Sequence, residues 1–141
     1  KRAQLKPETQ WEIEQGLTLT AETVHAASVI RSRWYARAAR LFEHYDALVL
    51  PSAQVWPFPA DWRWPDQIAG RQMDTYHRWM EVVIPASLAG LPALALPCGF
   101  GVGGLPMGMQ VMGRSGDDAG ILAIGLAWAE ATDWPGRRPP L

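Results

Sequence analysis

The stretch GFGVGG, residues 99–104, has the spacing G-x-G-x-x-G that binds dinucleotide cofactors in other proteins. That chemistry needs the third glycine to open a helix, because the pyrophosphate binds the free N–H groups of the first helical turn. Here Pro106 follows, and then the segment MGMQVMG, whose two further glycines make it poor helix material. The stretch therefore predicts a glycine-rich turn between two strands, and we expect no cofactor.

The residue types of a hydrolase triad are also present, in Ser52, His77 and Asp46. No sequence spacing requires these three to meet, and Ser52 lacks the G-x-S-x-G turn that exposes a nucleophile. The histidines are dispersed and Cys98 is the single cysteine, whereas two helical histidine ligands stand about four residues apart. We expect neither a catalytic centre made from these residues nor a metal site.

Aromatic residues gather in the segment AQVWPFPADWRWPDQIAG, residues 53–70. Its prolines and tryptophans follow no helical or strand period, which predicts a long loop that the tryptophans keep ordered. Trp56 and its neighbours offer flat faces on which a ring of a ligand could stack. Packing of these tryptophans over the core is the favoured alternative.

Three helices are expected to position these residues. A short one covers residues 8–16 and is closed by Gly16, and a final one runs from Asp117 and Asp118 to about Thr132. Between them, a long helix begins after Thr20 as N-cap and runs to about residue 44. Its apolar residues share one stripe and are predicted to face the core: Val24, Ala27, Trp34, Ala38, Leu41 and Tyr45.

Residues 48–50, 93–97 and 108–112 form short apolar runs of strand length, and the first is ended by Pro51. We predict that they lie in one sheet, with the last two adjacent and antiparallel because a short glycine-rich link joins them. Helices are expected to cover one or more faces of this sheet. The fold class is therefore α/β, a mixed sheet flanked by helices.

The segment DTYHRWMEVVIPASLAG predicts a helix from Thr75 to about residue 89, kinked at Pro85. A helical register places four of its side chains on one stripe, namely His77, Met80, Ile84 and Leu88. The stripe suits either core packing or the wall of a binding pocket. Both interpretations stay open at this point.

The bulk composition narrows the function classes. With 141 residues, 48% of them hydrophobic, the chain suits one folding unit, and the proline-rich residues 135–141 read as a loose tail. A net charge of −1 argues against a nucleic-acid partner, and no apolar run approaches the roughly 20 residues of a membrane helix. One cysteine fits a reducing compartment, so we expect the cytoplasm. The missing initial methionine suggests a fragment of a larger protein.

Four segments in order together resemble the C-terminal portion of the amidase signature family. They are YDALVLPS after a long arginine-bearing helix, then SLAGLPALALPCGF, GLPMGMQVMGRSGDDAGIL and LAWAEAT. The likeness spans residues 20–132, and no single segment would suffice. It implies that GFGVGG is a turn between neighbouring strands of a large mixed α/β/α fold.

The resemblance implies an enzyme that hydrolyses carboxamide bonds with a Ser-cisSer-Lys centre. That centre would lie upstream of the matched region, so no catalytic residue can be assigned in this chain, whose only lysines are Lys1 and Lys6. The segment from Thr75 would border the substrate pocket. The substrate-binding candidates are His77, Met80 and Ile84, with Ser52 and Trp56.

Within the resemblance, relatives that take glutamine as ammonia donor present an acid from this helix. Aligned on LAGLP, the matching position here is Met80, which disfavours glutamine and favours a small aliphatic or aryl amide. Two alternatives remain: a non-catalytic interaction module that binds through its tryptophan loop, and the amidating subunit of a tRNA-dependent amidotransferase. The expected partner is the N-terminal part of the same enzyme, and the sequence leaves a homo-oligomer open.

Overall fold

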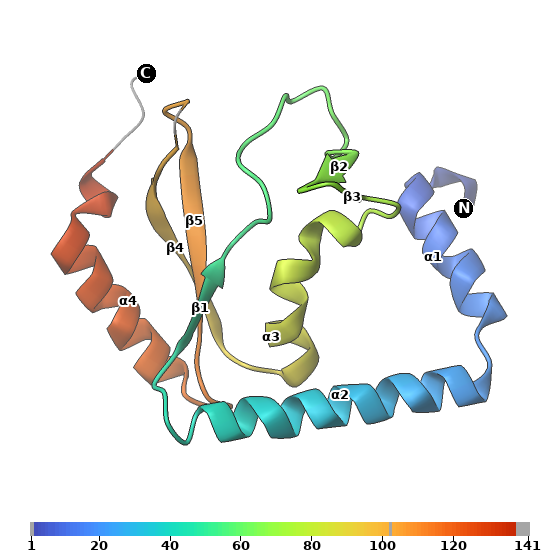
Figure 1. Ribbon diagram of the computed structural model, residues 1–141, viewed down its shortest axis with the longest axis horizontal. Coiled ribbons are helices and arrows are strands. Elements are labelled where there is room, and N and C mark those ends of the chain that lie inside the picture. The colour runs from blue at the N-terminus through green and yellow to red at the C-terminus, as the bar shows by residue number, and fades with distance from the viewer. Residues whose placement is uncertain (1, 102, 138–141) are drawn as a thin grey trace.

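The computed structural model describes residues 2–101 and 103–137 and arranges them around a three-stranded sheet (Figure 1). The strands are β1 (Leu48–Pro51), β4 (Ala93–Phe100) and β5 (Pro106–Met112), in the order β1-β5-β4. Both pairings are antiparallel. The predicted strands and the predicted antiparallel pair are therefore confirmed, with β4 and β5 each extending toward the turn that joins them.

The glycine-rich link is that turn. Gly104 has a φ of 70°, and the Gly101 N–H donates to the Leu105 carbonyl at 2.9 Å, which closes the hairpin. Between Gly99 and Gly104 the chain turns back instead of opening a helix. The dinucleotide geometry is thus absent from the described part of this stretch, which lacks residue 102.

One face of the sheet is covered by α4 (Asp118–Thr132). The helix starts at the two aspartates as predicted, and Asp117 caps it, because its carboxylate accepts from the Gly120 N–H at 3.1 Å. Gly125 faces the Leu94 side chain, and the Trp128 indole N–H donates to the Pro97 carbonyl at 2.9 Å. Helix and sheet therefore approach closely where glycine leaves room.

The helical segments η2 (Arg78–Val83) and α3 (Ile84–Ala89) connect the tryptophan-containing loop to β4 (Figure 1). Here the structure corrects the prediction of one helix over residues 75–89. Pro85 cannot donate to the Glu81 carbonyl and its ring would clash there, so residues 78–83 take the tighter 3-10 form and an α-helix starts only at Ile84. Its end at Gly90, which has a φ of 62°, agrees with the prediction.

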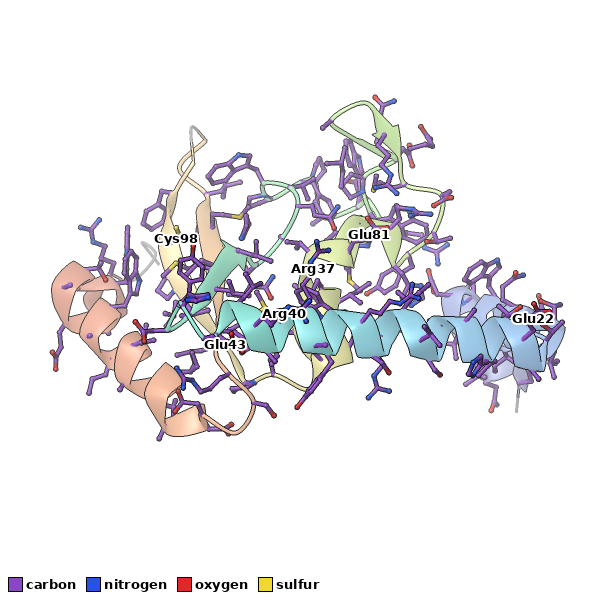
Figure 2. All side chains as sticks on the ribbon, turned by 60° about the horizontal axis from the view of Figure 1, so that its bottom comes forward. Glu22, Arg37, Arg40, Glu43, Glu81 and Cys98 are labelled. Atoms are coloured by element: carbon purple, nitrogen blue, oxygen red, sulfur yellow. The ribbon has the colours of Figure 1, made fainter. Side chains whose placement is uncertain are left out.

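The long helix α2 (Ala21–Leu41) begins as predicted, because the Thr20 hydroxyl accepts from the Thr23 N–H at 3.1 Å. Figure 2 shows it crossing the molecule from Glu22 toward Arg37 and Arg40. Its predicted core stripe is only partly correct. Ala38 is buried, but Val24 and Ala27 are exposed, since the N-terminal half of α2 runs past the sheet. Tyr45 is also exposed and lies beyond the end of α2 at Leu41.

Contacts between α2 and α3 tie the helices together. The Trp34 indole N–H donates to the Pro85 carbonyl at 2.8 Å, and Arg31 donates to the Leu88 carbonyl at 2.9 Å. The buried apolar residues of the core are few: Ala38, Phe42, Met73, Ala86, Ala89, Val111, Met112 and Ile121. Most of them come from α2, α3, β5 and α4, so the core lies where these elements meet the sheet.

The remaining elements lie at the edges. Helix α1 (Pro7–Thr18) lies where the short helix was predicted, after the 3-10 turn η1 (Arg2–Gln4), but it continues through Gly16, so the predicted end at Gly16 is wrong. The tryptophan loop is ordered and contains an unpredicted hairpin, β2 (Gln67–Ile68) with β3 (Arg71–Gln72). The segment predicted as a loose tail starts within a 3-10 turn, η3 (Trp134–Gly136), and residues 138–141 lie outside the described residues.

Candidate functional site

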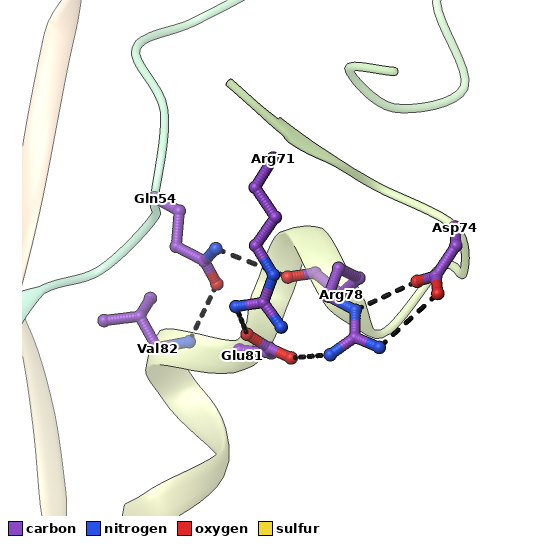
Figure 3. Close-up of polar contacts among 6 residues, drawn as sticks. All are labelled: Gln54, Arg71, Asp74, Arg78, Glu81 and Val82. Atoms are coloured by element: carbon purple, nitrogen blue, oxygen red, sulfur yellow. Dashed lines mark hydrogen bonds and ion pairs between the residues drawn. The ribbon is translucent and has the colours of Figure 1, made fainter. Parts of the chain in front are cut away.

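The 3-10 segment η2 carries the half-buried Met80 and is held from outside by side-chain amides. Gln54, in the loop after β1, accepts from the Val82 N–H at 3.0 Å and donates to the Arg78 carbonyl at 3.3 Å (Figure 3). Gln110 of β5, which is 6% exposed, donates to the Val82 carbonyl at 2.8 Å. The loop and the sheet thus both bond to the backbone of η2.

Charged side chains form a chain of contacts on the outer side of η2 (Figure 3). Arg78 donates to Asp74 at 2.9 Å and to Glu81 at 2.7 Å, and Arg71 reaches Glu81 at 3.4 Å. The hydrogen bond from Arg78 lowers the pKa of the Asp74 carboxyl below its usual value of 3.8. Hydrogen bonds to Asp74 and then to Glu81 raise the pKa of Arg78.

His77 lies at the N-terminal end of η2 and pairs with α1. Its Nε2 stands 2.5 Å from the Glu12 carboxylate, and it borders a hollow of about 210 Å³ between α1 and the loop. An ion pair between Glu8 and Arg63 closes the same junction. His77 therefore faces α1.

Ile84 lies at the other end of η2 and faces elsewhere. It lines an apolar groove of about 890 Å³ between α2 and α3, together with Leu88, Trp34 and Val24. The predicted stripe of His77, Met80, Ile84 and Leu88 is therefore split, because the 3-10 form changes the angle between successive side chains. His77 and Ile84 do not share one wall.

Ser52 and Trp56 lie along the segment that leaves β1. The Ser52 N–H donates to the Gly108 carbonyl at 3.0 Å, and a Cβ at Gly108 would stand 2.6 Å from the Ser52 hydroxyl oxygen. Trp56 is 55% exposed and its ring covers Gly101, where a Cβ would stand 2.7 Å away. Gln54, between them, bonds to the backbone of η2, so this segment is joined to the segment that carries Met80.

The structure does not assemble the triad residue types. Ser52 lies against β5, whereas His77 is paired with Glu12. Among residues 2–101 and 103–137, no three His, Cys, Asp or Glu side chains are grouped as metal ligands. In the same described part of the chain, no helix is both long and apolar enough to cross a membrane.

The tryptophan loop is more open than predicted. Trp62 is 52% exposed and stacks on Phe58 with ring centroids 6.3 Å apart, while Phe58 meets Trp79 edge-on at 5.7 Å. Only Trp64 among the loop tryptophans is half-buried. The expectation that these rings pack over the core is thus wrong for Trp56 and Trp62.

Sequence reasoning missed Gln54 and Gln110. Gln54 sits in a loop without periodicity, which gave no signal. Gln110 did give a sequence signal, because it is a polar residue in the middle of the apolar run MGMQVM. A polar group buried in such a run needs hydrogen-bond partners.

The structure consists of antiparallel strands with α4 on one face and, beside them, the 3-10 segment η2, whose backbone is hydrogen-bonded by two glutamines. This arrangement is one portion of a larger α/β architecture. A family model described as Amidase matches residues 1–122, and the chain belongs to the amidase family. The fold is that of the amidase signature enzymes. A bacterial aryl acylamidase superposes with a TM-score of 0.81 at 24% identity, covering 99% of this chain and 30% of that one.

Two further relatives are similar to this chain. A solved structure described as an amidase matches with a TM-score of 0.72 at 29% identity, covering 90% of this chain and 29% of that one. A glutamyl-tRNA(Gln) amidotransferase subunit of Myxococcus xanthus (strain DK1622) is 39% identical over 102 residues, which are 72% of this chain and 20% of that protein. The chain thus spans about a fifth of the length of this curated relative.

Proposed function

We propose that the protein of which this chain is part hydrolyses carboxamide bonds, converting an amide and water into a carboxylate and ammonia or an amine. The match of residues 1–122 to the amidase family carries this proposal. By the resemblance described above, the Ser-cisSer-Lys centre lies upstream of this chain. The chain then supplies sheet strands behind that centre and part of the substrate pocket.

Within this proposal, Met80 of η2 contacts the substrate, with Ser52 and Trp56 on the adjoining segment. Met80 is half-buried, and Gln54 between the other two bonds to the backbone of η2. A thioether and an indole make an adaptable apolar wall, which suits a small aryl or aliphatic amide. His77 and Ile84 line separate hollows at the two ends of η2, so they are not part of this wall.

A second candidate function is the amidating subunit of a tRNA-dependent amidotransferase. Relatives at 39% and 40% identity are named as subunits of glutamyl-tRNA(Gln) amidotransferase. Met80 weighs against this role, because a thioether cannot pair with the ammonium group of glutamine at a position where an acid is expected. We therefore rank the amide hydrolase first.

The test uses the full-length parent protein, produced alone. We expect it to release an amine from an aryl amide without tRNA or a second protein chain. Glutamine-dependent amidation of glutamyl-tRNA with a copurifying partner, and no aryl-amide turnover, would instead establish the amidotransferase. Absence of both activities would favour the non-catalytic module with its exposed tryptophans.

A further inference from the structure

We propose that Gln54 and Gln110 are positioning residues, which hold η2 against the sheet and so fix where Met80 stands in the substrate pocket. The inference rests on the proposed function, because it assigns Met80 a contact with an amide substrate. Both glutamines act through the backbone of η2, and neither touches the reacting bond.

The hydrogen bonds reach η2 on both sides of Met80. Gln54 Nε2 donates to the Arg78 carbonyl at 3.3 Å, and Gln54 Oε1 accepts from the Val82 N–H at 3.0 Å. Gln110 Nε2 donates to the Val82 carbonyl at 2.8 Å. Residue 82 is thus held at both its N–H and its carbonyl, and Met80 lies between the two anchored residues.

Both glutamines are themselves fixed to the sheet. Gln110 sits on the central strand β5, paired with Leu50 on one side and Ala95 on the other. Its Nε2 also donates to the Pro51 carbonyl at 2.9 Å, so both amide hydrogens are used. Gln54 follows β1 closely, and the Ser52 N–H bonds back to β5. The position of η2 is therefore set by the sheet.

The segment η2 depends on such outside contacts. A 3-10 helix has poorer hydrogen-bond geometry than an α-helix and is short, and Pro85 removes a donor at its end. The Arg78 pairs with Asp74 and Glu81 involve side chains that are 31%, 60% and 37% exposed, so water and salt weaken them. Gln110 is almost fully buried, so water weakens its hydrogen bonds less, and together with those of Gln54 they determine where η2 lies.

The experiment compares the full-length parent with its Gln54→Met and Gln110→Met variants, which keep the side-chain length and remove the amide. Gln15→Met, on the exposed surface of α1, is the matched control. The readouts are hydrogen exchange of residues 78–83 and the ratio of kcat/KM for a bulky aryl amide to that for a small aliphatic amide. Each glutamine variant is also combined with Met80→Ala.

Gln54→Met removes two hydrogen bonds to η2. We expect it to speed exchange in residues 78–83 and to change the kcat/KM ratio by at least about fivefold, the effect of losing one net hydrogen bond. The change should be smaller in the Met80→Ala background, because the glutamines act through Met80. Gln15→Met should alter neither readout. Gln54 is half-buried, so this variant tests the inference even where Gln110→Met does not fold.

Two results would overturn the inference. If hydrogen exchange of residues 78–83 is unchanged in Gln54→Met, Gln54 does not hold η2, whatever the activity of the variant. Faster exchange with an unchanged kcat/KM ratio would show that the glutamines stabilise η2 without affecting substrate choice. The same conclusion would follow if the changes in the kcat/KM ratio from the glutamine variant and from Met80→Ala were additive. Absence of amide turnover in the wild-type parent would count against the proposed function itself, and exchange would still decide whether the glutamines hold η2.

Discussion

At the residue scale, the Arg78 guanidinium controls the protonation of Asp74. Arg78 Nε donates to Asp74 Oδ1 at 2.9 Å and Arg78 Nη2 approaches Oδ2 at 3.5 Å, which favours the charged carboxylate and lowers its pKa. The folded chain therefore binds fewer protons at Asp74 than the unfolded chain. Stability from this contact is present above the usual pKa of 3.8 and is lost as the pH falls through the lower folded value.

Asp74→Asn is predicted to loosen the start of η2 at neutral pH and to have no effect in acid. We would measure hydrogen exchange of residues 74–83 in wild type and variant at matched pH values. The wild type should be better protected near neutral pH, and the difference should vanish well below 3.8, where Asp74 is protonated in both states. A difference that persists unchanged into strong acid would mean that the carboxylate charge plays no part.

Met80→Asp is predicted to select against apolar amides in the intact enzyme. An unpaired carboxylate in an apolar pocket costs roughly a few kcal/mol to desolvate or raises its own pKa. An amide that bears an ammonium group would pair with it and should suffer less. The measurement is kcat/KM for both amides, with Met80→Leu as the volume-conserving control. An equal loss for both substrates would show that Met80 packs in the core.

Some residues stood out in the sequence, and their contact with a substrate stays a prediction. Met80 stood out by alignment on LAGLP, and Ser52 as a residue type of a hydrolase triad. Gln54 did not, because its role depends on where a loop returns in space. Hydrogen bonds over 24 and 28 residues of separation leave no local pattern.

At the element scale, the helix ends at Thr20, Asp117 and Gly90 were predicted, whereas the predicted end of α1 at Gly16 was wrong. Thr20 and Asp117 both accept from backbone N–H groups as N-caps, and Gly90 ends α3 in the left-handed conformation. The hairpin of β2 and β3 was missed for the opposite reason. Its turn puts Ala69 at a φ of 49° and Gly70 at 80°, and alanine gives no turn signal where asparagine or glycine is usual.

Gly125→Ala is predicted to destabilise the contact between α4 and β4. The new methyl group would collide with the Leu94 side chain, and overpacking costs about 1–3 kcal/mol against a gain of about 1 kcal/mol in helix propensity. Gly16→Ala in α1 is the matched control, because nothing stands within 4 Å of its Cβ. Urea unfolding of the parent protein should show a lower midpoint for Gly125→Ala only. Equal urea midpoints for Gly125→Ala and Gly16→Ala would mean that the Leu94 side chain moves aside without an energetic cost.

At the scale of the whole molecule, the α/β class and the sheet followed from three apolar runs of strand length and the helices predicted around them, and the family followed from the order of four segments and not from any one motif. The surfaces that His77 and Ile84 face did not follow, because one helical register over residues 75–89 put both on one wall. With η2 in the 3-10 form and Pro85 after it, His77 faces α1 and Ile84 faces α2 instead. A local break in helix geometry thus separated two residues that were predicted to lie together.

The last prediction concerns what this chain does alone. We expect the purified 141-residue chain to hydrolyse no aryl amide above the solvent background. Serine attack needs an activating base and donors for the oxyanion, and the structure pairs His77 with Glu12 while Ser52 lies against Gly108. Mixing with the upstream part of the parent should restore turnover, measured as amine release. Turnover by the isolated chain that Ser52→Ala abolishes would reveal a local catalytic centre and refute this assignment.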